Sequence, residues 1–185
     1  MELVLGPESL DTKVSFLVGA GAGSFSHAGT NLLAHLLGTY EMLRSWGVRD
    51  ALCDAGLFHS VYGTESYVET VLPMSHRTRV RALIGADAEE SAYLFGVMIK
   101  RTFYETLAKR GAFSVCCRLT GNRIVLRESQ VADLCQLAVA NWLEQRPRVA
   151  VQYQFMKRAE FGAMRRFLSP PARLALDTIY HFDTV

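Results

Sequence analysis

The sequence lacks the features that mark membrane and exported proteins. It contains no run of about 18 apolar residues, so we expect no transmembrane helix and no membrane as a partner. The N-terminus begins Met-Glu-Leu-Val and has no basic region followed by an apolar stretch. A signal peptide is therefore not expected, and the sequence predicts a cytoplasmic protein.

An excess of one charge is also missing. The 20 Lys and Arg residues are nearly balanced by 18 Asp and Glu residues, which leaves a formal charge of +2. The basic residues are scattered, so nucleic acid is not an expected partner. The four cysteines form no Cys-x-x-Cys pair, and the adjacent Cys116 and Cys117 would point to opposite faces of a strand. We therefore expect reduced thiols rather than disulfides.

The residues that are present favour one helical domain. Half of the 185 residues are apolar, which is enough for a core. Apolar residues recur at three- and four-residue steps and predict helices over 31–46, 50–61, 75–84, 88–109, 129–145, 150–168 and from 169 onward. Two short strands are expected over 113–127 about a Gly-containing turn, and residues 9–18 fit either a helix or a strand. The expected fold is all-α with a small β-hairpin insertion.

A glycine-rich segment separates the start of the chain from this domain. Residues 19–24 read Gly-Ala-Gly-Ala-Gly-Ser after an apolar run, which invites comparison with phosphate-binding loops. The spacing is G-x-G-x-G rather than G-x-G-x-x-G, and no Lys-Ser or Lys-Thr pair follows. We therefore interpret residues 1–25 as an N-terminal segment with a flexible connector, and residues 26–185 as the helical domain.

Three of the five histidines, His27, His35 and His59, lie between Ser26 and Glu65. His35 falls in the middle of one predicted helix and His59 near the end of the next. A short connection joins these helices, so they should pack antiparallel and bring the two imidazoles together. Such a pair can bind a divalent transition metal, with iron, manganese and zinc as the candidates. The alternative is two unrelated core histidines, each hydrogen-bonded to a carbonyl group.

The segment around these histidines resembles a known family. Residues 28–35 read Ala-Gly-Thr-Asn-Leu-Leu-Ala-His, and residues 55–65 read Ala-Gly-Leu-Phe-His-Ser-Val-Tyr-Gly-Thr-Glu. These stretches and their separation resemble the HD superfamily of metal-dependent phosphohydrolases, in particular the hydrolase domain of (p)ppGpp synthetase/hydrolases. The string Gly-Leu-Phe-His-Ser-Val-Tyr-Gly-Thr is also similar to that of a group of small HD-like bacterial proteins.

The resemblance implies an HD-like fold with His35 and His59 as metal ligands. It also implies that His27 contacts substrate, or that it supplies a third nitrogen to the metal. The chain departs from the family at the acidic positions. Ser60 replaces a metal-bound aspartate, and Gly63 and Thr64 replace the acidic pair that positions water. The last metal aspartate falls at Leu137 when Asn141 is aligned with the family's asparagine.

Other residues can rebuild or extend such a site. His27, Tyr62 and Glu65 are candidate catalytic residues, and Asp54, Asp133 and Glu144 are further carboxylates that could complete the ligand set. Candidate substrate-binding residues are Ser60, Thr64, Arg77, Arg79 and Arg81. Three arginines over five positions can form a phosphate-binding face, although such a run is also typical of a solvated helix flank.

Three functions remain open at this point. The first is an HD-like metal-dependent enzyme acting on a small phosphorylated or nucleotide-like substrate. The second is an HD-fold iron oxygenase or another small-molecule enzyme of secondary metabolism. The third is a catalytically inactive domain that binds a ligand or partner without a metal cofactor. An apolar face formed by Leu174, Leu176, Ile179 and Tyr180 would either pack on the core or form a homodimer contact.

Overall fold

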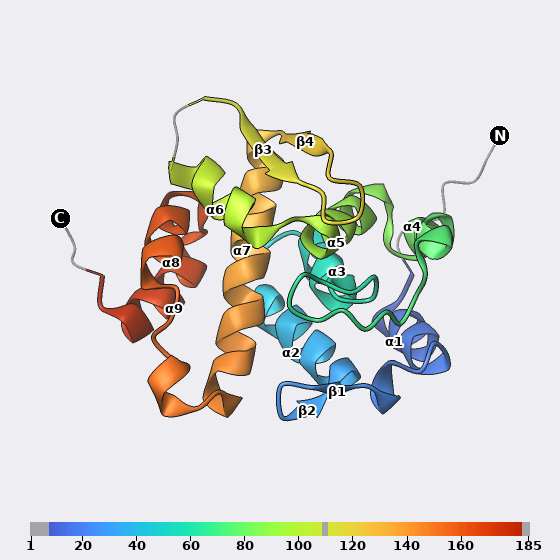
Figure 1. The fold of residues 1–185 in the computed structure, drawn as a ribbon. Coiled ribbons are helices and arrows are strands. Elements are labelled where there is room, and N and C mark those ends of the chain that lie inside the picture. The colour runs from blue at the N-terminus through green and yellow to red at the C-terminus, as the bar shows by residue number, and fades with distance from the viewer. Residues whose placement is uncertain (1–7, 109–110, 183–185) are drawn as a thin grey trace.

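The computed structural model describes residues 8–108 and 111–182, and helices account for most of these residues (Figure 1). Two antiparallel hairpins accompany the helices, β1 (Ser26–His27) with β2 (Thr30–Asn31) and β3 (Phe113–Cys116) with β4 (Arg123–Leu126). The predicted all-α fold with a small hairpin insertion is confirmed, and the β1–β2 hairpin is an addition to it. The helices are α1 (Leu10–Gly19), α2 (Leu32–Ser45), α3 (Asp50–Phe58), α4 (Arg77–Ile84), α5 (Ala86–Val97), α6 (Lys100–Ala108), α7 (Glu128–Gln145), α8 (Arg158–Met164) and α9 (Pro170–Tyr180).

Helix α7 occupies the middle of the molecule (Figure 1). Helices α2 and α3 lie on one side of it and α8 and α9 on the other, while the β3–β4 hairpin crosses one end. Leu36 of α2, Leu57 of α3 and Leu137 of α7 are fully buried in one apolar core. The core therefore lies between the helices that carry the predicted histidines and the long helix that follows the hairpin.

Local sequence sets the ends of α2. The Asn31 side chain accepts a hydrogen bond from the backbone N–H of Ala34 (2.9 Å), which caps the start of the helix. The helix ends at Ser45, and Gly47 has a φ of 66°, a conformation that suits glycine at a helix end. His35 meets His59 while Leu43 meets Gly56, so α2 and α3 run antiparallel as expected. A Cβ atom on Gly56 would lie 2.5 Å from Leu43 Cδ1, so glycine allows this close approach.

The helix predicted over 88–109 is wrong as a single element. Helix α5 ends at Val97, and Met98 adopts an extended conformation before α6 begins at Lys100. The N–H of Ile99 donates to the Cys116 carbonyl (2.9 Å), and Met98 forms an isolated bridge with Cys117. Pairing with the hairpin therefore replaces two helical residues. Residue 109 lies outside the described residues.

The helix predicted over 150–168 is also wrong. The segment contains short 3-10 helices over 151–153 and 165–167, and α8 covers only Arg158–Met164. Lys157 precedes α8 with a φ of 64°, a left-handed conformation that no continuous helix includes.

The two ends of the described chain pack on the core. The segment predicted as a helix or a strand forms helix α1 (Leu10–Gly19), with Leu17 fully buried, and Ala22 in the glycine-rich connector is also buried. On α9, Leu176 and Tyr180 are buried, whereas Leu174 is 70% exposed. The predicted apolar face thus packs mostly on the core. No helix in the described ranges is long and apolar enough to cross a membrane.

Candidate functional site

The two predicted ligand histidines meet in the core between α2 and α3. Both side chains are fully buried, and their Nε2 atoms lie 3.1 Å apart. The His59 ring also packs edge-on against Phe95, with ring centroids 5.3 Å apart. The structure thus brings together residues from two helices, as the antiparallel packing predicts.

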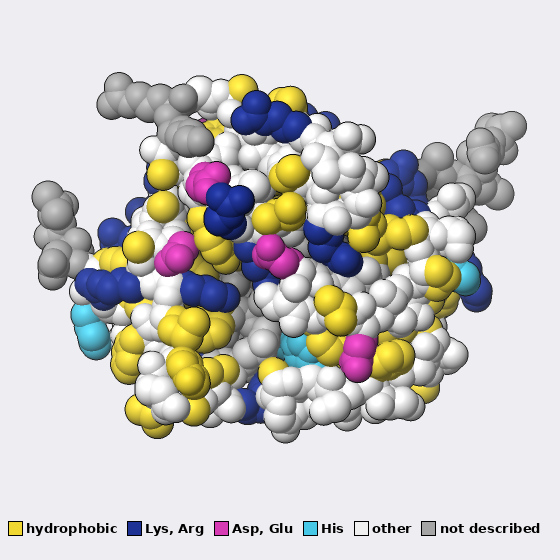
Figure 2. Space-filling model, in the orientation of Figure 1, with side chains coloured by type: hydrophobic (Ala, Val, Ile, Leu, Met, Phe, Trp, Pro, Cys, Tyr) yellow, Lys and Arg dark blue, Asp and Glu magenta, His cyan; other side chains and the backbone are white. Residues whose placement is uncertain are grey.

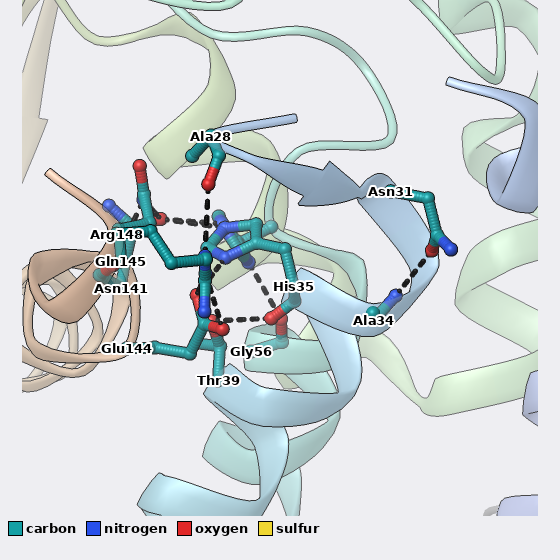
Figure 3. Close-up of polar contacts among 11 residues, drawn as sticks. Ala28, Asn31, Ala34, His35, Thr39, Gly56, Asn141, Glu144, Gln145 and Arg148 are labelled. Atoms are coloured by element: carbon teal, nitrogen blue, oxygen red, sulfur yellow. Dashed lines mark hydrogen bonds and ion pairs between the residues drawn. The ribbon is translucent and has the colours of Figure 1, made fainter. Parts of the chain in front are cut away.

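The contacts of the two Nδ1 atoms determine which ring nitrogen carries the proton in His35 and in His59. His59 Nδ1 lies 2.7 Å from the Gly56 carbonyl oxygen, which can only accept a hydrogen bond. His35 Nδ1 contacts the Glu144 carboxylate, as Figure 3 shows. Because both Nδ1 atoms donate, both Nε2 atoms carry an unprotonated lone pair in the neutral rings.

Glu144 is itself held in place by an arginine. The Arg148 guanidinium donates to both Glu144 oxygens, at 2.6 and 2.7 Å, and through Nε to the Ala28 carbonyl (2.9 Å) (Figure 3). These contacts link the end of α7 to the β1–β2 hairpin. The carboxylate that orients His35 therefore has little freedom to turn away.

Asn141 brings an oxygen atom to the same point. Its Oδ1 lies 3.1 Å from His35 Nε2 and 2.9 Å from His59 Nε2. Gln145 Nε2 donates to both the backbone oxygen and Oδ1 of Asn141, each at 2.9 Å. Since a backbone carbonyl only accepts, Gln145 must present its amide nitrogen, and the Asn141 atom facing the histidines must be oxygen.

His35 Nε2, His59 Nε2 and Asn141 Oδ1 therefore lie about 3 Å from one another, each with a lone pair facing the other two. In the neutral state no proton lies between them. Such an arrangement requires a shared cation or an added proton. Two ligand atoms about 2.1 Å from one ion and near a right angle lie roughly 3 Å apart, so these separations fit a metal ion. Among residues 8–108 and 111–182, no three His, Cys, Asp or Glu side chains form such a group. The third donor is instead the Asn141 amide.

Burial favours the neutral state of His59. It lowers the pKa of His59 to about 3, and the nearby charge of His35 acts in the same direction. The ring is therefore neutral at pH 7, which is the form that binds metals.

His27 lies beside the pair rather than in line with it. Its ring stacks on that of His35, with centroids 4.2 Å apart, and meets Tyr67 edge-on at 4.6 Å. Both ring nitrogens are buried, without a hydrogen-bond partner among the described residues. Burial, followed by repulsion from His35, lowers the pKa of His27 to about 4. His27 is thus a neutral base next to the site.

The other predicted catalytic residues have structural partners elsewhere. Glu65 Oε2 accepts from the backbone N–H of Lys100 (2.9 Å) at the start of α6. The buried Tyr62 hydroxyl donates to Glu89 (3.2 Å), and burial raises the pKa of this phenol. Thr64 accepts from the Tyr67 N–H (3.1 Å), and Ser60 is buried after α3. The structure does not bring Glu65 or Tyr62 into contact with the histidine pair.

The predicted anion-binding arginines also have partners. Arg77 donates to both oxygens of the fully buried Glu89, at 2.6 and 2.8 Å, and Arg81 contacts the same carboxylate at 3.4 Å. The Arg79 guanidinium lies 4.9 Å from the ring centre of Phe16. The arginines thus neutralise a buried carboxylate and cover an aromatic ring.

Of the three further carboxylates considered, only Glu144 reaches the site. Asp54 forms a buried ion pair with Lys13, and Asp133 pairs with Arg49.

Sequence reasoning included Glu144 of α7 among the candidate carboxylates but missed its polar neighbours on α7 and just after it. Asn141, Gln145 and Arg148 were not site candidates, although they follow one another at steps of three to four residues together with Glu144. Such a polar stripe along an apolar helix is the signal that could have indicated them.

Comparison with known proteins adds one finding. The model of a domain of unknown function (DUF6817) matches residues 16–101. This span includes His27, His35 and His59 but ends before α7. Neither curated proteins nor solved structures gave a significant match.

Proposed function

We propose that this protein is an HD-like metal-dependent enzyme that acts on a small phosphorylated or nucleotide-like substrate. His35, His59 and Asn141 would hold a divalent transition metal. The observation that carries this proposal is the convergence of two Nε2 lone pairs and one amide oxygen at separations of 2.9 to 3.1 Å.

The surroundings of the three donors support the proposal. Histidine ligands of metals commonly donate their second N–H to a carboxylate or a backbone carbonyl. Glu144 and the Gly56 carbonyl act in this way here. Without a shared cation or an added proton, three mutually facing acceptors would be unfavourable, because each loses its bonds to water on burial.

The chemistry follows from the neutral donor set. A bound divalent ion supplies Lewis acidity and lowers the pKa of water. His35, His59 and Asn141 would leave both positive charges of the ion uncompensated, which favours an anionic substrate. His27, neutral and stacked on His35, is placed to accept a proton beside the site.

The HD-like assignment rests on the order of these residues. Two histidines on consecutive antiparallel helices and an oxygen ligand on a later helix resemble that superfamily. The departures are Ser60 in place of one metal-bound aspartate, and the Asn141 amide as the oxygen ligand while the family's last metal aspartate falls at Leu137. Two histidines and one oxygen also resemble the ligand set of non-haem iron oxygenases, which makes an iron oxygenase the second candidate.

The first test is elemental analysis of protein purified without an affinity tag, before and after reconstitution with iron, manganese or zinc. We expect about one metal ion per chain in the wild type and none in the His35→Ala/His59→Ala variant. Asn141→Asp should bind the ion at least about tenfold more tightly, because a carboxylate is the better ligand for a divalent cation. The exposed His181→Ala variant is the control.

The metal then separates the candidates. Zinc or manganese with phosphoester hydrolysis would support the hydrolase-like enzyme, and iron with oxygen-dependent turnover would support the oxygenase. A folded wild type that binds none of the three ions would contradict both and favour a ligand-binding domain without a metal.

A further inference from the structure

A narrow pocket opens beside the metal-binding candidate Asn141, between α6, α7 and the residue before α8. Its walls include Asn141, Lys100, Lys157, Tyr104, Trp142 and Phe161. Asn141 therefore takes part in both places, because its Oδ1 lies at the histidine pair and the residue also lines the pocket. Figure 2 shows Lys and Arg side chains among apolar ones over α6 to α8, and a histidine visible near α2.

Among residues 8–108 and 111–182, neither lysine of this pocket forms an ion pair with a carboxylate. Lys100 Nζ donates to the Ser66 hydroxyl (2.9 Å), and Lys157 Nζ lies 5.0 Å from the Trp142 ring centre. None of the ion pairs formed in the described ranges includes either lysine. By contrast, the half-buried Arg77 and Arg165 each contact a carboxylate.

The positive charges of these two lysines are also unfavourable when no anion occupies the pocket. Burial, followed by the charge of the neighbouring Lys157, lowers the pKa of Lys100 to about 8, while Glu65 partly opposes this. Burial likewise lowers the pKa of Lys157, against the effect of Glu160. Two half-buried ammonium groups near each other gain from any anion placed between them.

We propose that Lys100 and Lys157 bind the anionic group of the ligand, a phosphate or a carboxylate, and that Tyr104, Trp142 and Phe161 contact its apolar or aromatic body. The end of the ligand that lies next to Asn141 would be the end that reaches the histidine pair. The identification of this ligand as the substrate rests on the proposed function, whereas the binding of an anion does not.

The pocket is small, so side chains must move before the proposed ligand can enter it. Its free space is about 20 Å³, which is enough for about one water-sized group. A phosphate or carboxylate with an aromatic body therefore displaces the lysine side chains from their present positions. Both have long flexible stems, and the Lys100 contact to Ser66 is a single hydrogen bond between half-exposed groups.

The test is calorimetric titration of the full chain with phenylphosphonate, benzoate and benzyl alcohol. These probes share an aromatic body and differ in charge. We expect both anions to bind the wild type more tightly than the alcohol, and the tighter anion to identify phosphate or carboxylate as the natural group. Lys100→Met and Lys157→Met should each weaken anion binding about tenfold and leave the alcohol unchanged.

Two further variants control for charge and folding. Arg101→Met removes a positive charge next to Lys100, but from a side chain that is 78% exposed and paired with Glu105, so it should leave affinity unchanged. Lys157→Arg keeps the charge and should retain most of the affinity. Thermal melts of each variant verify that it is folded.

The metal content of the same samples separates this inference from the proposed function. Anion binding that is lost in the lysine variants supports the inference whether or not a metal is bound. A wild type that binds neither anion, or lysine variants that bind them as well as Arg101→Met does, would overturn it. The metal-site proposal would then stand or fall on its own measurement.

Discussion

Burial controls the charge of individual side chains at the histidine pair. His35 and His59 are fully enclosed, and the stacked His27 has both ring nitrogens buried. As a result the pKa values of His59 and His27 fall to about 3 and about 4. Protonation of these rings is therefore easier in the unfolded chain, where a histidine titrates near 6.5.

This difference predicts that metal-free protein loses stability in mild acid. Between pH 6.5 and the folded-state pKa values, the unfolded state binds more protons, so stability falls as pH falls through this window. Each of the two histidines contributes a slope of up to roughly 1.4 kcal/mol per pH unit. Urea unfolding of chelator-treated protein at pH 7.5, 6 and 5 measures it.

The variants separate this effect from general acid denaturation. His27→Gln and His59→Gln should each reduce the pH slope, whereas the exposed His181→Gln should keep the slope of the wild type. Equal slopes in all four proteins would contradict the assignment of the acid sensitivity to the buried rings.

The residue pattern predicted half of the site. His35 and His59 are close in sequence and lie on consecutive helices, so helical spacing was enough to pair them. Asn141 lies more than 80 residues after His59, and a neutral amide on an apolar helix has many uses. Its role follows from the packing of α7 against α2, which no local pattern specifies.

Contact between helices sets how closely Glu144 approaches His35. Helix α2 carries Gly38 where it meets α7, and a Cβ atom there would lie 2.8 Å from Glu144 Cγ and 2.9 Å from its Oε1. Position 38 thus requires glycine because the Glu144 side chain occupies the space that a Cβ atom would need. The backbone conformation there does not itself require glycine.

Gly38→Ala should displace Glu144 from His35 and weaken metal binding about tenfold, the usual scale for losing a partner of a metal ligand. Metal titration with a competing chelator measures this change. Gly19→Ala, at the end of α1 with open space around it, is the control and should leave metal affinity unchanged. Equal affinities in the two variants would show that Glu144 does not depend on this contact.

The boundaries of elements show where local patterns fail. The stretch 88–109 has helical periodicity and no proline, and its one glycine, Gly96, still lies inside α5, yet the chain leaves the helix at Met98 to pair with Cys116 and Cys117 of the hairpin segment. Hydrogen bonds to a strand distant in sequence outweigh a modest helix propensity. Residues 150–168 similarly contain helix-forming residues but include Lys157 in a left-handed conformation.

Across the whole molecule, a buried ion pair joins the N-terminal helix to the helical core. Lys13 Nζ donates to both oxygens of Asp54 on α3, at 2.8 and 2.7 Å, and both side chains are less than a tenth exposed. Leu17 on the same helix enters the common core. The segment before residue 26 thus contributes to the stability of the helices that follow it.

Lys13→Met should lower the free energy of unfolding by roughly 3 kcal/mol or more, because it leaves Asp54 buried without a cation. The double variant Lys13→Met/Asp54→Leu should recover most of this loss, since both charges are then absent. Arg44→Met, in the exposed pair with Asp50, should cost less than about 1 kcal/mol. Urea unfolding at pH 7 compares the three, and a Lys13→Met cost no larger than that of Arg44→Met would contradict the prediction.

The break between α5 and α6 ties two distant parts of the chain to each other. Arg118, just after β3, donates through its backbone N–H to Val97 and through Nε to Gly96, both at 2.7 Å, so the hairpin holds the last turn of α5. The direction in which α6, which begins at Lys100, leaves this corner is therefore set by the hairpin (Figure 1). An insertion or deletion in the hairpin would therefore move the Lys100 ammonium group and redistribute the positive charge that lines the pocket.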